Sequence, residues 1–208
     1  SAQYPNGGFA QTYPLRGGYH DAITINDGVM ETLLRLLQDV ATQPQFAMLP
    51  VALREQAAQQ FQLGIQLLLR SQLQLQGELT VWAAQYHPVE LTPVAARAYE
   101  WPALVSTESA GITLLLMEQA PTPAMIQSVE AAVRWFERQQ ISGHKLQRDA
   151  QGARLVPSAG AKPLWARFYD LTTQQPLFVD RDGKRYADVS QLSVERQRGY
   201  GWYQSDAA

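Results

Sequence analysis

Residues 27–40 read DGVMETLLRLLQDV, and this stretch sets the helical character of the chain. Its apolar side chains recur at nearly helical spacing from Val29 through Leu33 and Leu37 to Val40. Asp27 stands where an N-cap belongs, because its carboxylate could accept the free N–H groups of the first turn. The pattern predicts an amphipathic helix that begins at Asp27.

Similar patterns predict further helices along the chain. One runs over 51–72 with a glutamine-rich polar face, and two more run over 106–119 and 123–139. Pro123 lies near the first position of its helix, where a missing N–H does no harm. A short helix is expected over 189–198.

The intervening segments have a different character. Residues 1–26 are predicted to form a loop, because prolines and paired glycines interrupt any regular spacing of apolar residues. Residues 79–87, 153–156 and 165–169 are strand-like, and 180–184 predict an Asp-Gly turn. Two helix pairs joined at one end by long aromatic loops indicate a mainly α fold: an incomplete α/α toroid with a few short β-strands.

Bulk composition excludes several classes of protein. The 208 residues carry a net charge of −2 and no cysteine, so no disulfide, thiolate nucleophile or Cys-based zinc site is available. Because positive and negative charges nearly balance, the chain lacks the strongly basic character that is typical of nucleic-acid-binding domains. No apolar run approaches the length of a membrane span. A monomer is the default expectation.

Asp27 has two readings. It could simply cap the helix, or it could be a hard oxygen ligand for Ca²⁺. In the second case Asn26, Asp21 or substrate oxygens would fill other positions. One carboxylate does not make a calcium site, and no EF-hand spacing is present.

Three basic segments could bind anions. Arg97 lies in the loop AARAYE, where it could pair with Glu100 or clamp a carboxylate bidentately. In an extended 165–169 segment, Trp165, Arg167 and Tyr169 would share one face, an arrangement suited to an acidic sugar. Residues 180–185 add Arg181 and Lys184, although an ordinary turn explains them equally well.

Other chemistries find less support. The three histidines lack metal-ligand spacing, and no serine lies in a nucleophile elbow. Glu108 is favoured in the first turn of its predicted helix by the dipole, but it could also be the acid of a glycosidase. The opening segment, with Tyr19 and His20, is rich in the aromatic residues and glycines that line sugar clefts.

A resemblance to a known family covers nearly the whole chain, in order. The strings that carry it are AQYPNGG (2–8), YPLRGGYHD (13–21), ITINDG (23–28), LTVWAAQ (79–85), ARAYEWPALVSTESAGI (96–112), PLWARFYDL (163–171), RDGKRY (181–186) and RGYGWY (198–203). They resemble the catalytic module of polysaccharide lyase family 10, the α/α-toroid pectate lyases.

The resemblance implies roles for individual residues. Arg97 corresponds to the base that removes a proton in β-elimination, and Asp27 to a ligand of the catalytic Ca²⁺. Arg167 and Arg181 correspond to arginines that bind carboxylates of polygalacturonate, with Lys184 beside them. Further candidates for sugar contact are the side chains of Tyr19, His20, Trp165, Tyr169 and Trp101.

The family's earlier Thr-x-Asp-Asn type calcium motif has no counterpart here. Residues 1–208 are therefore expected to be the C-terminal portion of the module, forming a single domain. The substrate implies secretion, because pectate is an extracellular polymer. Two alternatives remain: a hydrolase on a similar fold that uses Glu108, and a pectate-binding fragment without catalysis.

Overall fold

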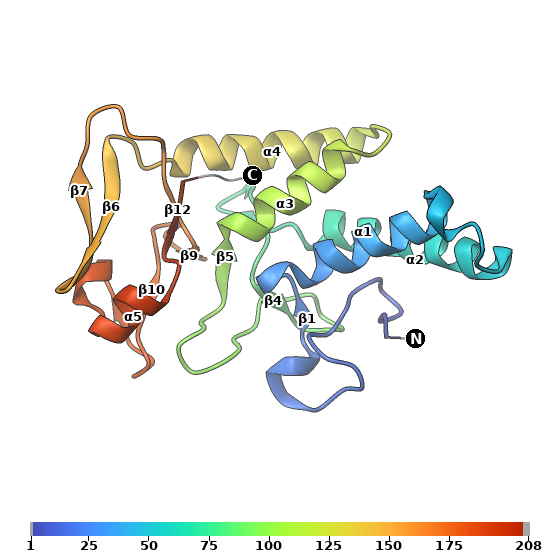
Figure 1. Cartoon of the computed structure of the whole chain (residues 1–208), viewed down its shortest axis with the longest axis horizontal. Coiled ribbons are helices and arrows are strands. Elements are labelled where there is room, and N and C mark those ends of the chain that lie inside the picture. The colour runs from blue at the N-terminus through green and yellow to red at the C-terminus, as the bar shows by residue number, and fades with distance from the viewer. Residues whose placement is uncertain (1, 206–208) are drawn as a thin grey trace.

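The computed structural model describes residues 2–205 and divides them into a helical part and a strand-rich part (Figure 1). The α-helices are α1 (Val29–Thr42), α2 (Val51–Ser71), α3 (Ser106–Met117), α4 (Pro123–Gln139) and α5 (Val194–Gly199). Short 3₁₀ turns cover Gly18–Asp21, Asn26–Gly28, Pro44–Phe46 and Val189–Gln191.

The strands are short and pair two by two, always antiparallel. They are β1 (Ile23–Thr24) with β4 (Gln85–Tyr86), β2 (Gln74–Leu75) with β3 (Glu78–Leu79), β5 (Ala103–Val105) with β9 (Phe168–Asp170), β6 (His144–Asp149) with β7 (Gly152–Pro157), β8 (Trp165–Ala166) with β12 (Tyr203–Gln204), and β10 (Phe178–Val179) with β11 (Arg185–Tyr186).

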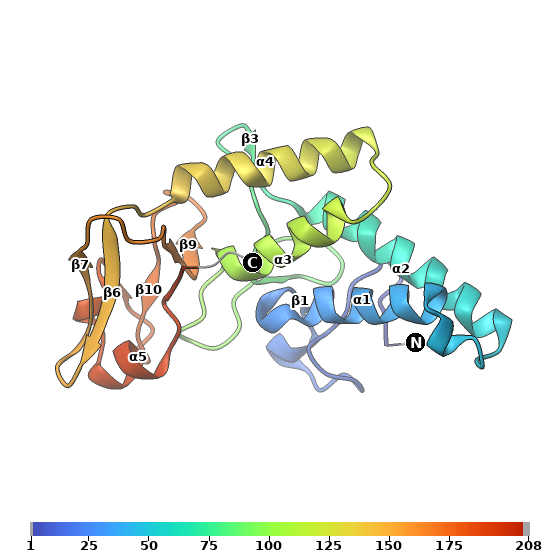
Figure 2. The same ribbon diagram turned by 45° about the horizontal axis from the view of Figure 1, so that its top comes forward.

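The longer helices occur where the sequence predicts them, but their assembly differs. Helix α1 packs against both α2 and α3, and α3 packs against α4 (Figure 2). Beyond α4, residues 141–204 form paired strands and the short α5, where the sequence predicts strand-like pieces and a short helix, and no α/α toroid is formed by the described helices. The expectation of an α/α toroid is therefore wrong. The fold is mixed. Turns let β2 pair with β3, β6 with β7 and β10 with β11 locally, whereas the other strand pairs join segments far apart in the sequence.

Two glycines allow helix α1 to approach its neighbours closely. A Cβ atom on Gly64 of α2 would lie 2.1 Å from Cδ2 of Leu34, and one on Gly111 of α3 would lie 2.0 Å from Oε2 of Glu31. Neither distance is possible for real atoms. The glycines thus fix how α1 lies against α2 and α3.

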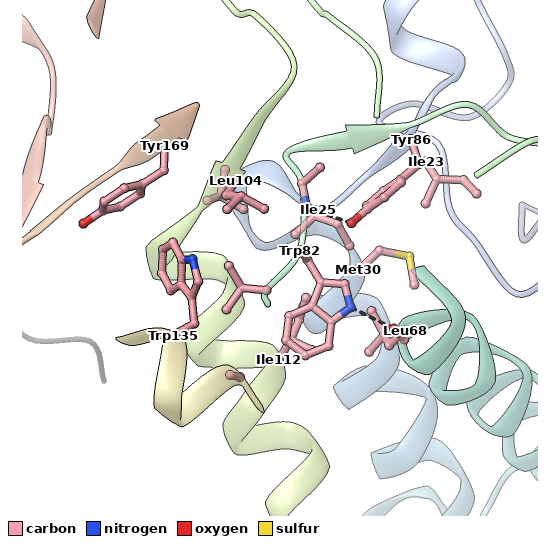
Figure 3. Packing of buried hydrophobic residues seen from close by; sticks show 14 of the residues in the cluster. Ile23, Ile25, Met30, Leu68, Trp82, Tyr86, Leu104, Ile112, Trp135 and Tyr169 are labelled. Atoms are coloured by element: carbon pink, nitrogen blue, oxygen red, sulfur yellow. Dashed lines mark hydrogen bonds between the residues drawn. The ribbon is translucent and has the colours of Figure 1, made fainter. Parts of the chain in front are cut away.

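A shared apolar core joins the two parts (Figure 3). Trp82 is fully buried and donates its indole N–H to the carbonyl oxygen of Leu68 at 2.8 Å. Trp135 of α4 meets Tyr169 of β9 edge to face, with ring centroids 4.9 Å apart. Because Tyr169 lies opposite Leu104 of β5, this contact links the helices to the strands.

No helix within residues 2–205 is long and apolar enough to cross a membrane.

Candidate functional site

The starts of α1 and α3 meet the β5–β9 pair near the centre of the molecule (Figure 1). Strand β5 leads directly into α3, and the N–H of Ser106 donates to the carbonyl oxygen of Arg167 at 3.1 Å. Glu108, in the first turn of α3, is thereby placed beside Arg167. Its Oε1 also accepts the N–H of Asp27 at 3.0 Å, which brings in the start of α1.

One nitrogen of Arg167 holds this junction together. Its Nη2 lies 3.0 Å from Oδ1 of Asp27, 3.1 Å from Oδ1 of Asn26 and 3.4 Å from Oε1 of Glu108. The guanidinium also stacks on Phe168 and Tyr200, at 5.4 and 5.0 Å from the ring centroids. Two carboxylates, an amide oxygen and a cation thus form one cluster.

Asp27 does not cap helix α1. The helix begins at Val29 with Gly28 as its N-cap, and no side chain closes that end. Asp27 instead adopts a left-handed conformation, with φ 58° and ψ 20°, and its side chain stays 56% exposed. Such a conformation is uncommon outside glycine and tends to persist at functional sites. The carboxylate is therefore directed to Arg167 and to solvent.

Glu108 is the buried acid of the cluster, with only 7% of its surface exposed. Its Oε2 has no hydrogen-bond partner. Burial raises the pKa of the Glu108 carboxyl, and the charge of Arg167 opposes this rise. The folded chain therefore holds a proton on Glu108 at a pH where the unfolded chain has lost it.

This shift predicts how Glu108→Gln changes stability with pH. Between the unfolded pKa and the raised folded pKa the folded state binds more protons, so the stability contribution of Glu108 falls as pH rises. A neutral glutamine removes that loss. We expect the variant to gain in free energy of unfolding, relative to the parent chain, from pH 4 to pH 7. Urea unfolding at both values measures this. The prediction would be contradicted if the parent chain became more stable relative to the variant between pH 4 and pH 7.

Arg97 lies on the loop between β4 and β5 and pairs with Glu100, as expected for a surface arginine. Its Nε donates to Oε2 of Glu100 at 2.8 Å, and its Nη2 donates to Oε1. Its side chain is 49% exposed and stacks on Tyr99 at 5.1 Å. The hydrogen bonds that Arg97 donates to the Glu100 carboxylate raise the pKa of the Arg97 guanidinium above its ordinary value.

Arg181 has a comparable arrangement. It makes a two-point pair with Glu195 at 2.7 and 3.1 Å and donates to the Tyr99 hydroxyl at 3.1 Å. Tyr99 therefore connects Arg97 and Arg181 in space. Lys184 is farther out: its Nζ lies 3.8 Å from the Asp182 carboxylate, and its side chain is largely exposed.

The remaining predicted residues lie around this centre. Tyr19 and His20 sit on the 3₁₀ turn Gly18–Asp21 with ring centroids 3.9 Å apart. Tyr19 is close enough to Arg97 to affect its pKa. The Asp21 carboxylate accepts the N–H groups of Arg16 and Gly17. Its described contacts therefore stabilise the local turn.

The alternation predicted around Arg167 is interrupted. Arg167 falls between β8 and β9, and its ring contacts are Phe168 and Tyr200. Tyr169 is fully buried. Trp165 donates its indole N–H to the carbonyl oxygen of Phe136 at 2.9 Å, which ties it to α4. Trp165 remains a candidate for sugar contact, whereas Tyr169 has no surface to offer.

Arg196 of α5 was missed by sequence reasoning. It is buried and stacks on Tyr99, Tyr200 and Trp202, at 5.0, 4.3 and 4.8 Å from the ring centroids. Arg97 and Arg181 also stack on the Tyr99 ring, and Arg167 also stacks on the Tyr200 ring. The four arginines therefore belong to one connected array. The spacing of Arg196 and Tyr200, one helical turn, was the available signal.

The oxygen atoms of the cluster suit a hard cation such as Ca²⁺. Asp27 offers an exposed carboxylate whose Oδ2 has only a weak 3.5 Å contact, from the Asn26 amide. The unpartnered Oε2 of Glu108 adds a second carboxylate oxygen to the cluster. Within residues 2–205, no three or more acidic, histidine or cysteine side chains group into a metal site. Asp27 fits a cation that completes its shell with substrate and water oxygens.

Comparisons with known proteins agree with one another. The family model for pectic acid lyase matches residues 1–208. A solved structure of a family 10 polysaccharide lyase from Cellvibrio cellulosa has a TM-score of 0.92 and 36% sequence identity over 99% of this chain. An Asp-to-Ala mutant of that family 10 lyase, in complex with trigalacturonic acid, gives a TM-score of 0.91 and 36% identity over 98% of this chain.

This chain spans 65% of the length of each of those two structures. No curated protein matches it.

Proposed function

This chain belongs to the pectic acid lyase family, and on that premise we propose that it binds polygalacturonate and cleaves it by calcium-dependent β-elimination. The observation that carries the proposal is the array of Arg97, Arg167 and Arg181, connected through Arg196 and its rings, beside the Asp27 carboxylate. Guanidinium groups bind carboxylates bidentately, and polygalacturonate presents one carboxylate on each sugar. The trigalacturonic acid bound by the related lyase supports the same substrate class.

The arginines are held ready for exchange with substrate. Without substrate, Arg97 pairs with Glu100, Arg167 with Asp27 and Glu108, and Arg181 with Glu195. We propose that sugar carboxylates take over from these internal partners at Arg167 and Arg181. Most of these pairs are partly exposed, so each exchange replaces one charged contact by another at small net cost.

In β-elimination the C5 proton is removed, a double bond forms between C4 and C5, and the C4–O bond breaks, so that the released oxygen takes up a proton from solvent and becomes a hydroxyl. The C5 proton is acidified by the C6 carboxylate beside it, and Ca²⁺ held by Asp27 would act there as a Lewis acid that stabilises developing negative charge. Arg97 would receive the proton, for which its guanidinium must first be neutral. Alkaline solution favours this form, so we expect a high pH optimum.

Glu100 offers a direct test of Arg97 as the base. Its hydrogen bonds raise the pKa of Arg97, so Glu100→Gln should let Arg97 lose its proton more easily. We expect the alkaline rise of kcat to move to lower pH in this variant. A profile that stays in place, with only KM changed, would mean that Arg97 binds substrate and does not take the proton. Glu130→Gln, at an exposed pair on α4, is the matched control.

The mass of the products tests the reaction itself. Elimination cuts the polymer without adding water, whereas hydrolysis adds one water molecule per cut. Digestion of polygalacturonate with calcium should yield fragments with an unsaturated end, as mass spectrometry would show. Fragments that have gained water would favour a hydrolase.

The hydrolase has one observation in its favour. Glu108 is a buried acid with a raised pKa beside the ionisable Asp27, an arrangement found in general acids of glycosidases. Under that alternative Glu108→Gln abolishes cleavage and Arg97→Ala does not. Binding of polygalacturonate without any product is the outcome expected of a non-catalytic fragment.

We further propose that the protein acts outside the cell, where pectate is found, as a monomer.

A further inference from the structure

Arg196 is a buried cation without a carboxylate partner. It is 4% exposed, and within residues 2–205 no acidic group lies at ion-pair distance from it. Its Nη2 makes one long hydrogen bond, 3.4 Å, to the carbonyl oxygen of Val179, and its Nε has none. The aromatic rings on which the guanidinium stacks compensate part of its lost hydration, but no anion balances its charge.

The guanidinium borders a cavity of about 200 Å³. Its lining includes Arg97, Tyr99, Arg181, Glu195, Arg196 and Tyr200. Arg97 and Arg181 each have a carboxylate of their own, Glu100 and Glu195. The charge of Arg196 is therefore the unpaired one in this lining.

The acids around Arg196 do not neutralise it at close range. Glu100 and Glu195 feel its charge, which contributes to the lowered pKa of both carboxyls, but each is bonded to another arginine. The Asp180 carboxylate accepts the N–H of Arg181 at 2.7 Å and the hydroxyl of Ser193 at 2.9 Å. Burial, together with the nearby Arg181, lowers the pKa of Arg196 itself. An anion in the cavity would offset this unfavourable burial.

We propose that Arg196 is a specificity-determining residue that makes this cavity select the ionised carboxylate of a galacturonate over the methyl ester of the same sugar. The proposal rests on the proposed function, because it concerns the same site. An ester group has the shape of the acid but no charge, so it cannot compensate a buried guanidinium. Arg97 and Arg181 should discriminate less between the acid and its ester, because internal carboxylates already balance their charges.

Binding measurements on Arg196→Met and Arg196→Lys test the proposal. Calorimetry gives the dissociation constants of trigalacturonic acid and of its methyl-esterified form. We expect Arg196→Met to reduce the preference for the acid about tenfold, the effect of losing one charged contact. Arg196→Lys keeps the positive charge and should retain most of the parent chain's preference for the acid. Arg134→Met, which removes an exposed arginine of α4, should leave the preference unchanged.

Stability separates this role from a purely structural one. Methionine fills the apolar surroundings without a buried charge, so Arg196→Met should unfold at the same temperature as the parent chain or higher. If it does not fold, Arg196→Gln serves the same comparison. An unchanged preference in the neutral variant would overturn the proposal.

The two proposals can fail separately. A parent chain that prefers the acid but releases no unsaturated product would contradict the lyase function and leave the role of Arg196 standing. A parent chain that releases this product, with a preference that Arg196→Met does not alter, would contradict only the role of Arg196.

Discussion

Arg97→Ala is expected to lower the rate of polygalacturonate elimination about 10³-fold, within the range for loss of a general base. Alanine has no group that can take the C5 proton. The Arg97 side chain is half exposed, but that of its partner Glu100 is only 11% exposed, so loss of the pair should lower the free energy of unfolding by about 1 kcal/mol without preventing folding. Initial rates of unsaturated product, measured across the alkaline range, give the effect.

Binding separates the loss of a base from the loss of the site. Arg97→Ala should still bind trigalacturonic acid, because Arg167 and Arg181 keep their positions at the two sides of the array. Arg134→Ala, at an exposed pair on α4, is the control for removing an arginine elsewhere. A variant that retains more than a tenth of the parent rate would rule out Arg97 as the base.

Arg167→Ala is expected to destabilise the protein by about 3 kcal/mol and to abolish substrate binding. One nitrogen of Arg167 contacts Asn26, Asp27 and Glu108, and its removal leaves two acids facing each other without a cation. The unpaired Glu108 carboxylate should contribute most of the lost stability, because it is buried. Urea unfolding at neutral pH measures the loss of stability, and calorimetry with trigalacturonic acid measures binding.

A double variant isolates the charge effect. Arg167→Ala combined with Glu108→Gln should recover part of the lost stability, since the unpaired buried carboxylate is gone. Binding should stay lost. Arg185→Ala removes the more exposed pair with Asp170 and should change stability much less. If the two single arginine variants were equally stable, Arg167 would not hold the junction as described.

The sequence predicted the longer helices well because each carries a local signal. Helix α4 spans Pro123–Gln139 as expected, and α2 ends within one residue of its predicted end. The arrangement of these helices depends on contacts between distant residues, such as Gly64 against Leu34 and Gly111 against Glu31. Periodicity contains no information on such pairs. The α/α toroid was therefore inferred from the pairing of the predicted helices, which the sequence alone could not establish.

The same limit applies to the site. Asp27 and Arg167 were both candidates, but nothing in the sequence showed that they touch across 140 residues. Asp27 looked like a helix cap, and only its left-handed backbone shows why its carboxylate turns away from α1. Arg196 was overlooked because a basic residue in a short polar helix usually faces solvent. The aromatic rings that enclose it come from two separate segments: Tyr99 lies between β4 and β5, and Tyr200 and Trp202 follow α5.

The central claim is that this chain performs calcium-dependent elimination on polygalacturonate. Its most direct test is the ultraviolet absorbance of polygalacturonate incubated with the chain at alkaline pH, with calcium and with a chelator. The account predicts a steady rise with calcium, from the double bond formed at each cut, and none with the chelator. Shortening of the polymer without any rise in absorbance would contradict it.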